Sequence, residues 1–189
     1  MKPRRIGLFG GTFDPPHFGH VAALRAAAST GRFDLIEVTV AGDPYRKSLE
    51  WVVLGAPVRL AMAQVAFADL DLVEVSNREI LRVGPSYTID TVRELLNEAQ
   101  SVDLIVGADL ALQLDGWHQA DALRDLVKVG VVPRPGSVTV EPPGWDSYQI
   151  PMDPVDLSSS FIRGLDYSSD SLKNFVPEQV IPLYEGARR

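Results

Sequence analysis

Short apolar runs alternate with helix-length segments along most of this 189-residue chain, and this alternation restricts the fold more than any other feature. The apolar runs predict strands at residues 5–10, 35–41, 70–76, 102–107 and 126–132, with a sixth strand at 147–151. Apolar residues at helical spacing predict helices at 17–30, 56–69, 88–99 and 108–126. Strands separated by helices form right-handed crossovers and a parallel sheet. We therefore predict an α/β fold, an open and mostly parallel sheet with helices on both faces.

Glycine and proline residues mark three long loops, at 42–55, 77–87 and 133–147. In open parallel sheets, ligands bind beyond the carboxyl ends of the strands, where the order of the strands reverses. The two segments at 10–20 and 106–123 begin at the ends of predicted strands, so we expect them to contribute to a ligand site.

Composition excludes several classes of protein. Hydrophobic residues make up 46% of the chain, enough for one ordinary core, and the net charge of −7 argues against a nucleic-acid surface. The chain has no cysteine, which excludes disulfides and thiolate metal sites. No run approaches the roughly 18 apolar residues of a membrane span, so we expect a cytoplasmic protein without a membrane partner.

The segment GGTFDPPHFGH, residues 10–20, follows the first predicted strand and opens the first predicted helix. Gly10 and Gly11 carry no Cβ, so their backbone can approach a ligand closely. We expect Asp14 to cap the helix and Pro15 to lie in its first turn. The backbone amides that follow would then favour an anion.

Two of the three histidines, His17 and His20, fall in this segment at a spacing that puts them on one helical face. Together they could donate hydrogen bonds to phosphate oxygens. The glycines match neither the dinucleotide-binding fingerprint nor the P-loop pattern. A metal pair completed by carboxylates stays open, since only His118 is left as a third imidazole, and so does a purely structural turn.

The same residues resemble the [TH]-x-G-H signature of the nucleotidylyltransferase superfamily, read here as residues 17–20. The resemblance implies a Rossmann-like sheet and transfer of a nucleotidyl group from a nucleoside triphosphate to a phosphate-bearing acceptor. It also implies that His17 and His20 contact the triphosphate as catalytic residues. The backbone of Gly10, Gly11, Thr12 and Phe13 would line the ATP site.

A second segment, DLSSSFIRG at residues 156–164, reads by itself as a serine-capped helix start with a surface arginine. Next to the histidine segment it resembles the I-S-S-T-x-[IVL]-R element of the superfamily, with Leu157 and Ser160 as mild departures. The resemblance implies that Arg163, Ser158 and Ser159 hold the β- and γ-phosphates of ATP.

Three further segments are similar to bacterial nicotinate-mononucleotide adenylyltransferases. They are GPSYTIDTV at 84–92, VGADLALQLDGWHQADAL at 106–123 and VVPRPG at 131–136. With the two phosphate segments, the resemblance runs in collinear order from about residue 5 to residue 165.

On the ATP side, this resemblance adds Gly107 and Asp109. The carboxylate of Asp109 would accept hydrogen bonds from ribose hydroxyls, although an aspartate at this position can equally be a helix cap.

On the acceptor side, the resemblance implies that Trp117 stacks on the pyridine ring and that Thr88, with Tyr87 beside it, holds the pyridine carboxylate. Arg134 and Lys47 would bind the acceptor phosphate. Read from the residues alone, the tryptophan is a core side chain and the two cations are solvated. The role of His118 stays open.

One departure from the family pattern concerns the acceptor. Ala41 and Gly42 fall where polar side chains are often found, and an acidic residue, Asp43, follows them. The acceptor could therefore be nicotinamide mononucleotide or another phosphate or phosphonate.

The resemblance implies an adenylyltransferase that makes deamido-NAD from ATP and nicotinate mononucleotide in NAD biosynthesis. Mg²⁺ would be bound mainly through ATP oxygens, with no metal ligand from protein side chains. A nucleotide-sensing module without turnover is the alternative from another class. We expect a single nucleotidylyltransferase domain over residues 1–189, with a small helical portion from about residue 157, and leave assembly into a homo-oligomer open.

Overall fold

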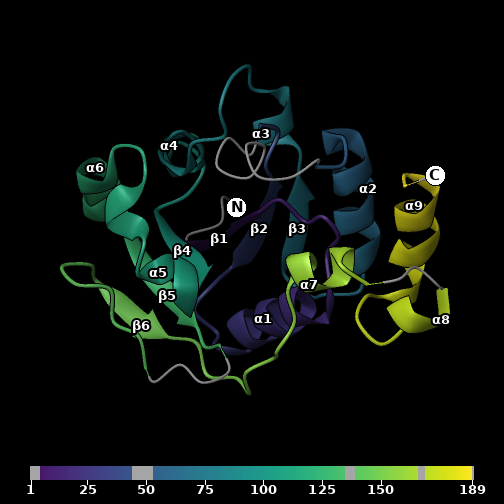
Figure 1. Cartoon of the computed structure of the whole chain (residues 1–189). Helices are drawn as coiled ribbons and strands as arrows, with labels where there is room; N and C mark the ends of the chain where they lie inside the picture. Colours follow the sequence, from purple (N-terminus) through teal and green to yellow (C-terminus); the bar gives the residue numbers. More distant parts are fainter. Residues whose placement is uncertain (1–4, 44–52, 135–138, 166–168, 189) are drawn as a thin grey trace.

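Six parallel strands form one sheet in the order β3-β2-β1-β4-β5-β6 within the part of the chain that the computed structural model describes, residues 5–43, 53–134, 139–165 and 169–188 (Figure 1). The strands are β1 Arg5–Gly11, β2 Leu35–Val40, β3 Val73–Ser76, β4 Ser101–Gly107, β5 Val127–Val132 and β6 Ser147–Gln149. Each predicted strand is present, including the sixth, and every pairing is parallel. The predicted fold class is confirmed.

The helices connect and flank these strands. The first group is α1 Phe18–Ser29, α2 Ala56–Phe67, α3 Arg78–Leu81 and α4 Thr88–Leu96. The second is α5 Ala108–Ala111, the 3₁₀ turn η1 Leu114–Gly116 and α6 Ala120–Leu126. The C-terminal group is α7 Ser159–Arg163, α8 Ser169–Leu172, the 3₁₀ turn η2 Glu178–Val180 and α9 Ile181–Gly186.

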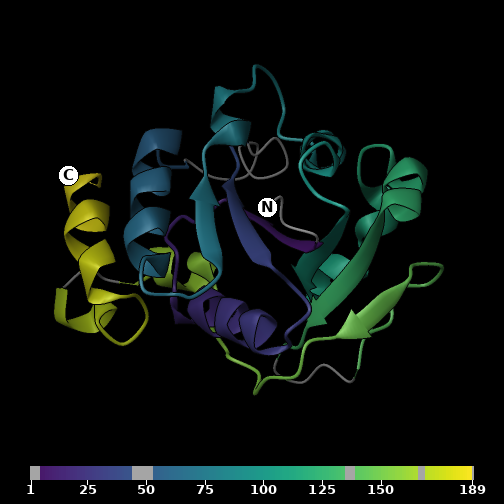
Figure 2. The ribbon, with the colours of Figure 1, turned by 180° about the vertical axis from the view of Figure 1, so that it is seen from behind.

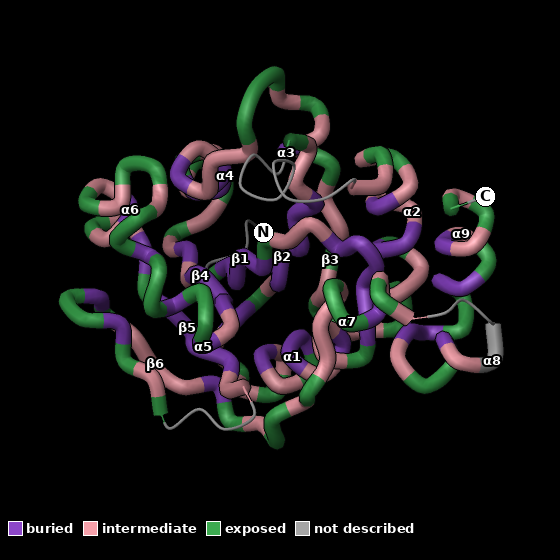
Figure 3. The backbone as a smooth tube through the Cα atoms, viewed as in Figure 1, coloured by how far each residue is buried: buried purple, intermediate pink, exposed green. Residues whose placement is uncertain are grey.

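Helices cover both faces of the sheet, as Figures 1 and 2 show from opposite sides. On one face, α4 and α6 pack over β1, β4 and β5, for example Val92 and Leu123 in one core cluster with Leu104. On the other face, α1 and α2 pack over β2, with Leu24 and Phe67 in a second cluster. Figure 3 shows the buried residues gathered in the central strands, with exposed residues on the outer sides of the helices.

The C-terminal helices pack on the outer side of α2 and form a third apolar cluster (Figure 1). Met62 of α2 contacts this cluster, which includes Ile162 of α7, Leu172 of α8 and Tyr184 of α9. The predicted packing helix at the end of the chain is therefore present as η2 and α9, and the cluster holds α7 close to the body of the sheet.

The strand order reverses between β1 and β4, which are neighbours in the sheet although two strands separate them in sequence. From β1 the chain proceeds outward to β2 and β3, and from β4 it proceeds the other way to β5 and β6. A crevice at the carboxyl ends of β1 and β4 is the expected ligand site of such a sheet.

Three sequence expectations differ from the structure. The strand expected from residue 70 begins at Val73, because Leu72 adopts a left-handed φ of 61° and ends a turn. The loop expected at 77–87 contains the short helix α3. The helix expected over 108–126 is broken into α5, η1 and α6, and Gln119 has a left-handed φ of 53° at the second break.

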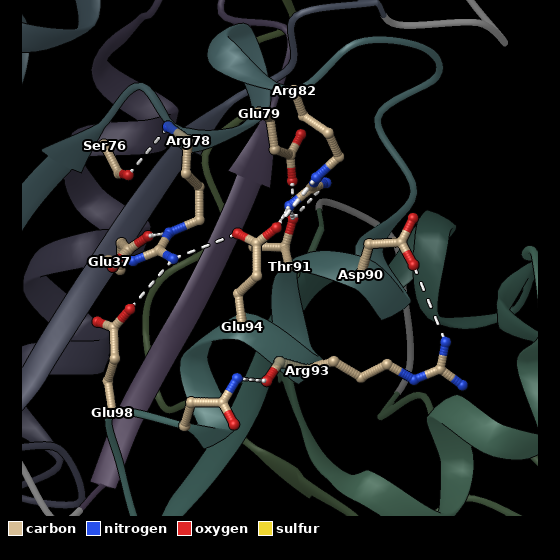
Figure 4. A network of polar contacts seen from close by, with 11 residues as sticks. Glu37, Ser76, Arg78, Glu79, Arg82, Asp90, Thr91, Arg93, Glu94 and Glu98 are labelled. Carbon is tan, nitrogen blue, oxygen red and sulfur yellow. Dashed lines mark hydrogen bonds and ion pairs between the residues drawn. The ribbon is translucent and has the colours of Figure 1, made fainter.

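Ion pairs attach α3 to β2 and α4, as Figure 4 shows. The guanidinium of Arg78 forms a two-pronged contact with the carboxylate of Glu37 on β2, with Nη2 3.1 Å from Oε2. It also reaches Glu94 and Glu98 of the α4 side at 3.3 and 3.5 Å. Burial acts to lower the pKa of Arg78, but Glu37 and Glu98 outweigh it and raise that pKa above its ordinary value.

We predict that Arg78→Met lowers the free energy of unfolding by about 3 kcal/mol, because it leaves a buried carboxylate without its cation. The side chain of Glu37 is only 8% exposed. Urea unfolding at pH 7 measures the effect.

Arg93→Met is the matched control, since Arg93 faces Asp90 at 3.9 Å across an exposed helix surface (Figure 4). Its loss should stay below about 1 kcal/mol. Equal losses in the two variants would contradict the special role of the Arg78 pair.

Candidate active site

A cavity of about 280 Å³ opens at the carboxyl ends of β1, β2, β4 and β5, where the strand order reverses. Many of the residues singled out in the sequence line it: Gly10, Gly11, Thr12, Phe13, His20, Thr88, Gly107, Asp109, Trp117, Arg134 and Ser159. The proposed ATP and acceptor residues thus share one cavity, although they come from five separate segments of the chain.

Four of the predicted site residues lie outside the lining of this cavity. His17 stacks on the lining residue His20, Tyr87 and Ser158 each precede a lining residue in sequence, and Arg163 binds Asp14 and Ser160, each next to a lining residue. Lys47 lies outside the described residues.

The turn between β1 and α1 differs from its expected form at one point. His17, not Asp14, is the N-cap residue of α1, and Pro15 precedes the helix. The side chain of Asp14 is 1% exposed and points toward the approach to α2, where its Oδ2 accepts a hydrogen bond from the Leu54 backbone at 3.4 Å. The expectation that Asp14 caps α1 is wrong, because this carboxylate accepts from the Leu54 backbone and not from the first turn of α1.

The two imidazoles of the turn lie against each other, with ring centroids 3.7 Å apart and planes 28° from parallel. His17 is buried behind the cavity, and His20 lines it. Nδ1 of His20 accepts a hydrogen bond from the backbone N–H of His17 at 3.1 Å. Because Nδ1 is the acceptor, the neutral His20 ring carries its proton on Nε2, and that nitrogen is the donor.

Phe13 supports the ring of His20. The two rings meet edge to face with centroids 5.1 Å apart, and Phe13 has a left-handed φ of 52°. A Cβ at Gly11 would stand 2.7 Å from the Phe13 ring. Gly11 is therefore needed for this close approach within the turn, in addition to its place on the cavity wall.

Helix α7 begins as the sequence predicts and is bonded to the same turn. The hydroxyl of Ser158 caps the helix by accepting from the Phe161 backbone at 3.1 Å. The Ser159 hydroxyl donates to the Pro15 carbonyl at 2.9 Å, and Arg163 Nη1 donates to the Asp14 carbonyl at 2.7 Å. These bonds bring the two predicted phosphate segments together from opposite ends of the chain.

Arg134 connects three parts of the cavity rim. Its Nε lies 3.3 Å from Oδ1 of Asp109, and its Nη1 donates to the Leu157 carbonyl at 2.8 Å. The end of β5, the start of α5 and the segment before α7 are thereby held around one side of the cavity.

Two further predicted acceptor residues, Trp117 and Thr88, line the cavity from the segments around η1 and α4. Trp117 follows η1, lines the cavity and packs against the core cluster of α4 and β4. Thr88, the first residue of α4, also lines the cavity. Tyr87 stacks on His118 with ring centroids 3.9 Å apart and an angle of 19°. The sequence left the role of His118 open, and this contact places its ring beside Tyr87, next to the cavity residue Thr88.

Sequence reasoning missed two features of the site. The sequence showed Gly42 only as a departure from the family pattern. In the structure the backbone of α3 packs against it, so a Cβ at this position would overlap the carbonyl oxygen of Glu79 and lie 3.0 Å from Cα of Ile80. Glu79 of α3 is a buried residue of the cavity lining, and its Oε1 accepts from the Thr91 hydroxyl at 2.7 Å (Figure 4). The backbone of Glu79 therefore takes the space that a side chain at position 42 would need.

Arg59 is the other missed residue. It is 1% exposed and donates to the carbonyl oxygens of Thr12 and Gly42, which follow the neighbouring strands β1 and β2. Burial lowers the pKa of Arg59, and the negative charge of Asp14 acts in the opposite direction. A single arginine on an apolar helix pattern has no sequence signal that would reveal these partners.

Within the described ranges, no group of three or more histidine, aspartate or glutamate side chains is placed to hold a metal ion. Among the same residues, no helix is both long enough and apolar enough to cross a membrane.

Comparison with known proteins agrees with this geometry. A family model described as cytidylyltransferase-like matches residues 8–165. A protein of Shouchella clausii named "probable nicotinate-nucleotide adenylyltransferase" is 34% identical over 184 residues, covering 96% of this chain and 94% of that protein. The chain belongs to the nicotinate-nucleotide adenylyltransferase family of cytidylyltransferase-like proteins.

Another relative with the same name, from Albidiferax ferrireducens, is 44% identical over 133 residues, which cover 69% of this chain and 66% of that protein. Among solved structures, the nicotinic acid mononucleotide adenylyltransferase of Plasmodium falciparum complexed with NaAD superposes with a TM-score of 0.77. It covers 97% of this chain and 95% of its own chain at 17% identity, which shows a common fold. The resemblance predicted from the motifs is confirmed.

We predict that Gly42→Ala costs roughly 1–3 kcal/mol of stability, because the new methyl group forces the backbone of α3 away from the end of β2. The free energy of unfolding in urea measures this.

Gly186→Ala provides the control, as a Cβ there meets nothing within 4 Å. It should change stability by less than about 0.5 kcal/mol. An unchanged Gly42→Ala protein would show that the packing of α3 on β2 is loose.

Proposed function

We propose that the protein transfers the adenylyl group of ATP to nicotinate mononucleotide, forming deamido-NAD and releasing pyrophosphate in NAD biosynthesis. The observation that carries this proposal is one cavity with the glycine–histidine turn on one side and Thr88 and Trp117 on the other. It supports binding of two nucleotides in contact, in a chain that belongs to the nicotinate-nucleotide adenylyltransferase family. The Plasmodium falciparum structure, which holds NaAD, is consistent with such a product in this fold.

The reaction needs no protein nucleophile. An oxygen of the acceptor phosphate attacks the α-phosphorus of ATP, the bond from that phosphorus to the bridging oxygen of the β-phosphate breaks, and pyrophosphate leaves. The substrate is the magnesium complex of ATP, with the ion held through phosphate oxygens. Catalysis then consists of positioning the two phosphates and stabilising the charge that develops.

His20 is the proposed donor to the triphosphate, because its tautomer puts the proton on Nε2 and its ring lines the cavity. His17 fixes that tautomer through its backbone and supports the ring from behind. Arg163 is a permanent cation held beside the same turn by the Asp14 carbonyl. Ser158 and Ser159, at the start of α7, are the remaining residues proposed to hold the β- and γ-phosphates.

The remaining cavity residues divide between the two substrates. Gly10–Phe13 and Gly107 provide backbone close to ATP, and the carboxylate of Asp109 accepts from a ribose hydroxyl. Trp117 stacks on the pyridine ring, and Tyr87 and Thr88 hold its carboxylate. Arg134 attracts the acceptor phosphate, and Lys47 stays a prediction outside the described residues.

We propose two further properties from the sequence. Residues 1–189 form one nucleotidylyltransferase domain with a helical portion from about residue 157, which the apolar cluster between α2 and the C-terminal helices supports. The protein is cytoplasmic. Assembly into a homo-oligomer stays open.

A pyrophosphate-release assay with ATP and a panel of acceptors tests the function. Nicotinate mononucleotide should give the highest kcat/KM. A higher value for nicotinamide mononucleotide, or for another phosphate or phosphonate, would reassign the acceptor. Nucleotide binding without pyrophosphate release from any acceptor would indicate a sensing module.

We predict that His20→Ala lowers kcat by roughly 10²–10³, the usual cost of losing one preorganised donor to a transition state. Steady-state pyrophosphate release measures it, and the midpoint of thermal unfolding checks that the variant is folded. Normal turnover by a folded variant would end the assignment of His20.

Trp117→Ala should raise the acceptor KM more than it lowers kcat, because stacking holds the ring in the ground state and in the transition state alike. Trp145→Ala is the matched control. Trp145 is buried in the same core cluster but lies outside the lining of the cavity, so its loss should lower stability without a change in KM. An effect of Trp117→Ala confined to the KM for ATP would contradict the stacking role.

A further inference from the structure

Arg59 of α2 is the largest side chain among the fully buried ones of the described residues, at 1% exposure. Its guanidinium donates to three backbone carbonyls. Nε bonds to Leu54 at 2.8 Å, Nη1 to Thr12 at 2.8 Å and Nη2 to Gly42 at 3.3 Å. Three segments of the chain therefore meet on one planar group.

A buried cation is expensive, because removing a charge from water costs several kcal/mol even after the protein relaxes. Asp14, also 1% exposed, supplies the opposing charge, and its Oδ2 accepts from the Leu54 backbone, next to the carbonyl that Arg59 holds. An apolar side chain would fill the same volume without this cost. Only arginine has a planar group with enough N–H donors to bind these three carbonyls at once.

The carbonyls on the fork belong to the two sides of the cavity. Thr12 lies in the glycine–histidine turn, one residue before the ring that supports His20. Gly42 follows β2, and its N–H donates at 3.0 Å to the hydroxyl of Ser86, which lines the cavity as Thr88 does. Arg59 thus joins the side proposed for ATP to the side proposed for the acceptor.

A second link runs from the same group toward α7. The carboxylate of Asp14 accepts from the Leu54 backbone, whose carbonyl Arg59 binds, and the carbonyl of Asp14 accepts from the guanidinium of Arg163. A displacement of the Arg59 guanidinium would therefore displace both the glycine–histidine turn and α7.

We propose that Arg59 is a positioning residue of the transfer reaction, which fixes the spacing between the triphosphate side and the acceptor side of the cavity. The inference rests on the proposed function. In this proposal, Arg59 aligns the acceptor phosphate with the α-phosphorus of ATP. It does so through the backbone it binds and contacts neither substrate.

Arg59→Lys tests the proposal, because it keeps the buried charge but cannot hold three carbonyls on a fork. We expect kcat to fall by about tenfold or more, since misplaced reacting groups lose rate steeply. The dissociation constants of ATP and of nicotinate mononucleotide, each measured alone by calorimetry, should change by less than about threefold, because each side keeps its own contacts.

Leu123→Ala is the matched control for loss of stability. Leu123 lies in α6, is fully buried in the core cluster of α4 and β4, and does not line the cavity. It should lower the thermal unfolding midpoint at least as much as Arg59→Lys does, with kcat unchanged below that midpoint. A kcat of Arg59→Lys within about twofold of the natural protein, or an equal loss of kcat in Leu123→Ala, overturns the proposal.

The double variant Asp14→Asn/Arg59→Met covers the case in which the lysine variant does not fold. Removing both buried charges together avoids leaving one of them without an opposing charge, which is the costly outcome of a single charge removal. The proposal expects this variant to fold and still lose kcat, and recovery of both stability and kcat overturns it. Absence of pyrophosphate release by the natural protein with every acceptor would instead refute the proposed function.

Discussion

Two hydrogen bonds between the turn after β1 and helix α7 bring the two ends of the chain to one place. Ser159 donates to the Pro15 carbonyl and Arg163 to the Asp14 carbonyl, across 144 and 149 residues of sequence. Without these bonds, the histidine turn and the serine–arginine segment would be two unrelated surface features. The apolar cluster between α2 and the C-terminal helices supports the contact, because Ile162 of α7 is buried in it. The proposed catalytic group depends on this docking more than on any single side chain.

Much of the fold could be predicted from local patterns. The runs at β1, β2, β4 and β5 are nearly continuously apolar, as expected for strands buried on both faces, and α4 has a clean helical stripe. The serine cap of α7 was predictable because a cap is a contact within four residues. The short helix α3 and the breaks among α5, η1 and α6 were not, because they depend on tertiary contacts and on a left-handed residue at Gln119.

The residues of the candidate site also divide into those that the sequence could reveal and those that it could not. Motif residues such as His20, Thr88 and Trp117 were found because each belongs to a recognisable segment, and the structure brings them to one cavity. Asp14 was misread as a helix cap, because its carboxylate accepts instead from the backbone of Leu54, which lies 40 residues away in sequence and belongs to no motif. Gly42 looked like a loss of polar contacts, whereas its missing side chain makes room for the backbone of α3.

A crystal structure of the protein with a non-hydrolysable ATP analogue and Mg²⁺ tests the central claim most directly. The account predicts that Nε2 of His20 and the guanidinium of Arg163 both lie within hydrogen-bonding distance of oxygens of one triphosphate, with the Gly10–Phe13 backbone against it. A triphosphate bound away from either group, or a metal ion chelated by His17 and His20 without the nucleotide, would contradict it.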